Sequence, residues 1–189
     1  MFGFLKNKAN DDKLSKEFVR QMFALGRNTC PSIAEGVEMW TGGEVHFPVN
    51  DDASLEVSLA IIGTALAVLE GRHSKVMTTE RGRQIAAACK QSIENDYGLP
   101  VESSRKMNQA LDEYRAAFDG SIASDKNPFG EVSGIMLVRC MGKNAMALCL
   151  PDVPGILSPL IHQTIGDVMT LTVAQALTFW KARAWGSNL

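Results

Sequence analysis

VPGILSPLIHQTIGDVMTLTVAQALTFW, residues 153–180, is the stretch that decides the predicted fold. Asp167 is its only formally charged side chain. Ser158 can cap a helix and Pro159 is favoured at the first helical position, so a helix is predicted to begin there. No later proline interrupts the chain, and the helix is expected to continue to about Ala184, over roughly 40 Å.

Apolar side chains cover more of this helix than one ordinary stripe would. One row, with spacings of three and four, consists of Ile161, Ile165, Val168, Thr172, Ala176 and Phe179. A second row beside it consists of Met169, Val173, Ala176, Trp180 and Ala184. A helix with so little polar surface is typically buried on most sides, so we expect it to be the centre of a bundle. The alternative is that its second face meets another subunit.

The rest of the chain also has helical periodicity. Further helices are predicted over about residues 12–25, 33–40, 53–70, 80–95 and 101–118. The segment 129–150 favours a helix, although a hairpin around Gly142 remains an alternative. The predicted architecture is all-α: a flexible tail over residues 1–10 and a single helical domain over 11–189, packed around the long, largely apolar C-terminal helix.

Two glycines carry specific expectations. Gly26 follows the last apolar residue of the first predicted helix and is expected to end it. Gly63 lies inside a helix, where glycine costs about 1 kcal/mol relative to alanine. Close packing would compensate for that loss, and Gly166 of the C-terminal helix is the predicted neighbour.

Composition limits the classes of partner. The 189 residues carry a net charge of −2 and a pI of about 5.9, which gives no global reason to expect nucleic acid or an anionic membrane. The C-terminal run holds His162, Gln163 and Asp167 and has no window of about 18 apolar residues, so no integral membrane segment is predicted there. The four cysteines form no C-x-x-C pair and are predicted to be reduced thiols in the cytoplasm.

The best candidate for a ligand site lies on the C-terminal helix. His162 is followed one turn later by Gly166, and an imidazole beside a glycine can face a flat ligand or a haem iron. Asp167 is a carboxylate on an otherwise uncharged surface, and it would need a cationic partner if it were buried. These three residues are the predicted ligand-binding set.

Other patterns are weaker. Glu70-x-x-His73 has the spacing of a di-metal bundle motif, but the motif occurs once and Gly71 interrupts it. Cys30 and His46 could pair as a nucleophile and base only if the fold brought them together. A modest basic region and a sulfur-rich segment are further candidates: Arg72, Lys75, Arg81, Arg83 and Lys90, and Met136, Cys140, Met141, Met146 and Cys149. Core packing is the preferred interpretation of the sulfur-rich segment.

The sequence therefore predicts no catalytic residue, no metal site and no cofactor. No nucleotide-binding, zinc-protease or hydrolase motif is present. The leading hypothesis is a non-enzymatic helical interaction or regulatory module that self-associates through apolar helix surfaces, with a second copy or another protein as its partner. The alternative is a helical sensor or carrier that binds a small apolar or haem-like ligand near His162.

Overall fold

The structure is a computed structural model, and it describes residues 2–71, 79–96, 100–123, 127–142 and 157–184. Over these ranges the chain forms helices joined by turns and coil, without a strand. The helices are α1 (Phe2–Trp40), α2 (Asp51–Glu70), α3 (Thr79–Asp96), α4 (Val101–Ala123), α5 (Gly130–Met141) and α7 (Leu157–Ala184). The predicted all-α class is confirmed.

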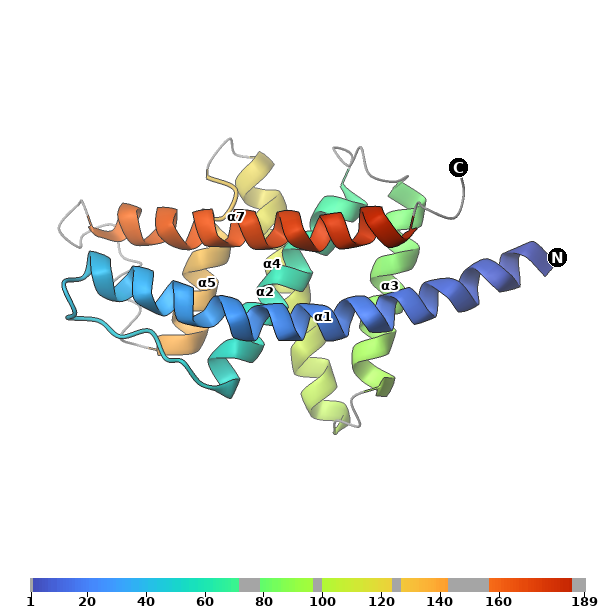
Figure 1. The fold of residues 1–189 in the computed structure, drawn as a ribbon, viewed down its shortest axis with the longest axis horizontal. Helices are drawn as coiled ribbons and strands as arrows, with labels where there is room; N and C mark the ends of the chain where they lie inside the picture. Colours follow the sequence, from blue (N-terminus) through green and yellow to red (C-terminus); the bar gives the residue numbers. More distant parts are fainter. Residues whose placement is uncertain (1, 72–78, 97–99, 124–126, 143–156, 185–189) are drawn as a thin grey trace.

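Two long helices form the front of the molecule. In Figure 1, α1 and α7 lie side by side and run in opposite directions, and the shorter helices cross behind them. Gly36 of α1 marks a close contact within this pair. A Cβ atom added there would lie 2.6 Å from Cγ2 of Thr164 on α7, so the two backbones can come this close only because glycine has no side chain.

The centre of the bundle is α2, which corrects the prediction that the C-terminal helix is central. Fourteen of the twenty residues of α2 are buried, and α2 packs against α1, α3, α4, α5 and α7. Ile161, Ile165 and Met169 of α7 are fully buried, but α7 is exposed along its opposite side. The exposed residues are Gln163, Asp167, Thr170, Leu171, Ala174, Gln175 and Thr178. The C-terminal run thus lacks charge because threonine, alanine and glutamine occupy its exposed side.

Helix α2 is long and apolar enough, by length and composition, to cross a membrane, and no other described helix meets that test. In the structure, however, 78% of its apolar window is buried inside the bundle. The core helix of a bundle has the same composition, because every side of it meets other helices. Its composition is therefore weak evidence for a membrane span.

Helix α1 continues through the glycine that was predicted to end it. Gly26 is buried against α2, and a Cβ atom added there would lie 2.8 Å from the Cα of Ser58. This glycine therefore permits a helix crossing and is not a terminus. Pro31 also lies inside α1, on its exposed side, where water can bond the carbonyl that proline leaves unpaired.

Because α1 continues, the break predicted between the helices over 12–25 and 33–40 is absent, and the non-helical region begins only after Trp40. The left-handed Gly42 and Gly43, with φ of 62° and 82°, end the helix, and the chain is non-helical as far as Asn50. The expected short helix over 33–40 is the last part of α1. Residues 2–10, predicted to be a tail, form the first turns of α1, which project beyond the other helices (Figure 1).

The ends of the other helices agree better with the sequence. Helix α2 ends at Glu70, followed by Gly71 as predicted, and the side chain of Asn50 caps its start by accepting a hydrogen bond of 2.9 Å from the Ala53 amide. Helix α4 runs past Gly120 to Ala123. The uncertain fifth segment is helical over Gly130–Met141, and its second half, 143–150, lies outside the described residues.

Gly63 permits the crossing of α2 with α4, and not a contact with Gly166 as predicted. A Cβ atom at Gly63 would lie 2.8 Å from the Cβ of Tyr114 and 2.9 Å from the carbonyl oxygen of Leu111. Gly166 instead faces the start of α5, 3.4 Å from the Cβ of Phe129 by the same measure. The prediction of close packing at Gly63 is confirmed, and its partner is corrected.

Candidate functional site

The exposed side of α7 is the first candidate site. Residues 168–180 contain no charged side chain, and Leu171, near the middle of this run, is 68% exposed. The hydroxyls of Thr170 and Thr178 donate to carbonyls of the preceding turn, at 2.7 and 2.8 Å, so they do not need water or a ligand as a partner. We call Thr170, Leu171, Ala174, Gln175 and Thr178 the α7 outer face.

Other exposed helix surfaces in the molecule carry many charges. The exposed side of α4, for example, carries Glu102, Arg105, Lys106, Asp112 and Asp119. The exposed side of α1 carries Lys13, Lys16, Arg20, Arg27 and Glu35. The α7 outer face, which begins one turn after the exposed Asp167, thus differs from its surroundings in having no charge, while it remains open to solvent.

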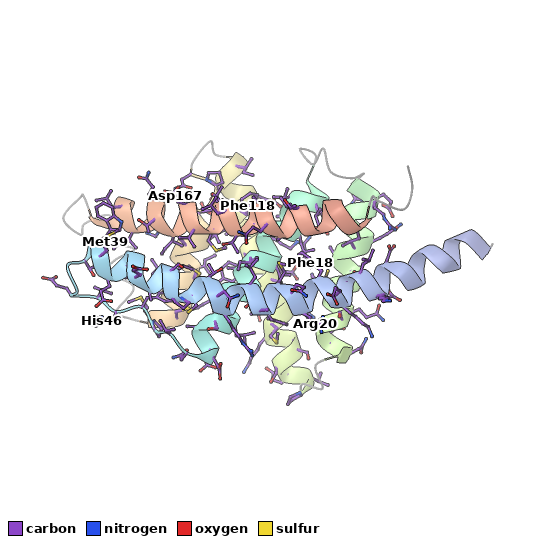
Figure 2. The ribbon with its side chains drawn as sticks, in the orientation of Figure 1. Phe18, Arg20, Met39, His46, Phe118 and Asp167 are labelled. Atoms are coloured by element: carbon purple, nitrogen blue, oxygen red, sulfur yellow. The ribbon has the colours of Figure 1, made fainter. Side chains whose placement is uncertain are left out.

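The three residues of the predicted ligand site do not form one site. His162 is half-buried between α7 and α5, and its Nδ1 lies 2.6 Å from the Ser133 hydroxyl oxygen. Gly166 is buried, whereas Asp167 is exposed on the outer side of α7 (Figure 2). His162 and Gly166 thus face the interior while Asp167 faces solvent.

The hydrogen bonding of His162 fixes its role. The Ser133 hydroxyl lies within hydrogen-bond distance of both the Gly130 carbonyl, at 2.9 Å, and Nδ1 of His162, at 2.6 Å, so it connects the imidazole to the first turn of α5. Burial lowers the pKa of His162 below its usual value. The residue is therefore a neutral imidazole that links two helices.

The second candidate site is an open cleft of about 630 Å³ between α1, α2 and α4. Its apolar surface comes from Phe23, Leu55, Leu59, Met107 and Ala110. Its charged residues are Arg27, Asp51, Asp52, Glu56, Lys106 and Arg139, and serines at 54, 58 and 103 complete the lining. The volume lies within the range of small-molecule sites, roughly 300–1,000 Å³. His162, Gly166 and Asp167 do not line it.

Two residues that line this cleft, Glu56 and Arg139, belong to a hydrogen-bonded network. The buried Tyr114 donates from its hydroxyl to Glu56 at 2.6 Å, and Nε of Arg139 lies 3.4 Å from the same carboxylate. Arg139 also bonds Glu113 and lies over the Tyr114 ring, 5.9 Å from its centroid. Burial, followed by the adjacent Glu56 charge, raises the pKa of Tyr114 well above its usual value. Glu56 and Arg139 are thus already paired within the protein.

The weaker patterns are not assembled into sites. Cys30 donates to the carbonyl of Pro48 at 3.5 Å, whereas the exposed His46 lies 3.5 Å from Glu38, so the proposed thiol–imidazole pair has different partners. Glu70 pairs with Arg115, and its predicted companion His73 lies outside the described residues. Among the residues that were searched, no group of three or more His, Cys, Asp or Glu side chains could hold a metal ion.

The basic region and the sulfur-rich segment are largely accounted for by internal packing. Arg81 forms an ion pair with Asp11, and Lys90 lies 2.6 Å from Asp112. Met136 is fully buried, in agreement with core packing. Cys30, Cys89 and Cys140 are free thiols. The exposed Arg83 lies 3.7 Å from Glu80, and Met141 packs against the core. The other members, Arg72, Lys75, Met146 and Cys149, lie outside the described residues.

Comparison of the chain with protein families, with curated proteins and with solved structures gives no match. The geometry of the α7 outer face and of the cleft is therefore the basis for a proposed function.

Proposed function

We propose that this protein is a non-enzymatic helical interaction module that self-associates through the α7 outer face. The observation that carries the proposal is the exposure of a helix side that carries no charge from Thr170 to Thr178, with Leu171 at 68%, on a molecule whose other helices expose many charges. Depletion of charge together with exposed apolar side chains is characteristic of the centre of protein interfaces.

The side chains of this face suit a contact between two helices. Ala174 is small, and the hydroxyls of Thr170 and Thr178 are bonded within the helix, so another helix can approach without leaving these hydroxyls unpaired. A second copy of the chain presents the same surface, and an isologous pairing would cover both faces with one contact. We keep a cytoplasmic location as part of this proposal.

Sedimentation velocity over a range of about 1 to 100 μM tests the proposal. The chain is expected to move from monomer to dimer across this range, and Leu171→Asp is expected to keep it monomeric because the interface would then bury an unpaired charge. Val101→Asp is the matched control, since Val101 is also apolar and 86% exposed but lies at the start of α4. A wild-type chain that stays monomeric throughout would contradict the proposal.

The alternative of an apolar or haem-like ligand near His162 has no comparable support. His162 already has Ser133 as a partner at 2.6 Å, and Asp167 faces solvent. This hypothesis stays a prediction that an absorbance spectrum of the purified protein can test.

A further inference from the structure

The cleft between α1, α2 and α4 carries charges of both signs, and they are segregated by helix. Its basic residues are Arg27 on α1, Lys106 on α4 and Arg139 on α5. Its acidic residues, Asp51, Asp52 and Glu56, all belong to α2. A ligand in this cleft would therefore meet acidic side chains on α2 and basic side chains on the helices that pack against α2.

Some of these charges are already neutralised inside the protein. Glu56 accepts from Tyr114 and pairs with Arg139, which also binds Glu113. These residues therefore have few hydrogen-bonding positions left for a ligand.

The charges nearer to solvent are less engaged. Arg27 is exposed and has no ion pair among the described residues, and Lys106 has only a long contact of 3.9 Å with Glu102. Asp51 and Asp52 are exposed in the first turn of α2, where the helix dipole favours their charge. Two cations, one on α1 and one on α4, and a pair of neighbouring anions on α2 are thus available to a ligand.

The uncharged part of the cleft lining is mostly apolar. Leu59 and Met107 are 2% and 8% exposed, and they line the cleft from α2 and α4. Phe23 contributes the α1 side. The Ser58 hydroxyl donates to the Ser54 carbonyl at 2.6 Å, so it does not require a ligand partner.

From this arrangement we propose that the cleft binds a small zwitterionic amphiphile. The apolar body packs against Phe23, Leu59 and Met107. The anionic group lies toward Arg27 or Lys106, and the cationic group lies toward Asp51 and Asp52. A purely anionic ligand would leave the α2 carboxylates facing it without compensation, and a purely cationic ligand would do the same to Arg27 and Lys106.

This proposal is independent of self-association, because the cleft and the α7 outer face share no residue. A site that presents both positive and negative side chains should discriminate among ligands that have the same apolar chain by the charge of their headgroups. The required probes therefore have one chain and different headgroups.

Calorimetric titration with octylphosphocholine, octyl sulfate and octyltrimethylammonium, each below its micelle concentration, makes this comparison. The zwitterion is expected to bind about tenfold more tightly than either ion, as one charge-assisted contact contributes about 1.5 kcal/mol or more. Asp51→Asn with Asp52→Asn should move the preference to octyl sulfate. Arg27→Gln with Lys106→Gln should move it to octyltrimethylammonium.

Glu80→Gln with Arg83→Gln is the matched control, because these exposed, paired residues of α3 do not line the cleft, and the preference should not change. Circular dichroism of each variant verifies that it is folded, and the single variants Asp52→Asn and Lys106→Gln give a smaller change in the same direction if a double variant is unstable. Equal affinity for the three probes, no binding, or a preference unchanged by the cleft variants would overturn the proposal.

Discussion

Substitution of Gly63 by alanine tests the helix crossing at the core of the bundle. The new Cβ atom would lie 2.8 Å from the Cβ of Tyr114 and 2.9 Å from the Leu111 carbonyl oxygen. Ordinary contact begins near 3.4 Å, so α2 and α4 must separate by about half an ångström, and a backbone carbonyl cannot move away as a flexible side chain can.

The expected magnitude combines two opposed effects. Overpacking typically costs about 1–3 kcal/mol, and about 2–3 kcal/mol is expected here because the new atom meets a backbone carbonyl. Alanine gains about 1 kcal/mol of helix propensity over glycine. The net loss is therefore about 1–2 kcal/mol, which lowers the melting temperature by about 2–8 °C in a chain of this size. Leucine at Gly63 adds more atoms to the same contact and should be more destabilising.

Urea unfolding followed by circular dichroism measures the effect, and Gly120→Ala supplies a control of opposite sign. Gly120 is exposed within α4, and the nearest atom to its added Cβ is 3.5 Å away, so alanine there should stabilise by up to about 1 kcal/mol. If Gly63→Ala were as stable as the parent, the close crossing of α2 and α4 would be refuted.

Three further predictions concern buried polar groups. Because burial holds the pKa of His162 below its unfolded value of 6.5, the unfolded chain binds the proton first. Stability should therefore fall as the pH drops below about 6.5, and thermal melts of His162→Gln should show a smaller pH dependence. Glu56→Gln weakens the contact with Arg139 and should cost about 1–2 kcal/mol in urea unfolding; Glu102→Gln, in an exposed pair, should change little, and equal losses would contradict the network. Burial raises the pKa of the Cys89 thiol to about 12, so mass spectrometry should find Cys89 unalkylated by iodoacetamide at pH 8 until urea unfolds the chain; rapid native alkylation would contradict its burial.

The sequence predicts the class of fold well because local signals agree. Helix α2 begins at Asp51, the first of two adjacent aspartates, and ends before Gly71. Helices α3 and α4 begin within about one residue of the predicted positions. Apolar residues at spacings of three and four are sufficient to identify such helices.

The sequence could not identify the central helix. Residues 57–69 of α2 and 168–180 of α7 are both runs of thirteen uncharged residues. The two helices differ in how many of their sides contact other helices, and that number depends on tertiary packing. Threonine and alanine are compatible with a buried or an exposed helix side, so the absence of charge alone misled the prediction.

The roles of Gly26 and Gly63 and the location of the sites also depend on contacts between helices, which the sequence does not reveal. Gly26 has the sequence context of a helix end, yet the structure uses it to bring Ser58 close to α1. The cleft unites Phe23, Leu59 and Met107 from three helices, and no sequence spacing connects such distant positions. In the sequence, Glu56 is a charged residue that precedes an apolar run. Its hydrogen bond with Tyr114 joins two helices and could not be predicted from the sequence.

Hydrogen–deuterium exchange at about 1 and 100 μM protein tests most directly whether α2 is the core while α7 offers the interface. We predict slow exchange of the α2 amides at both concentrations, and protection of residues 168–178 that rises with concentration. Exchange of residues 168–178 that is the same at both concentrations, or faster exchange in α2 than in α7, would contradict this arrangement.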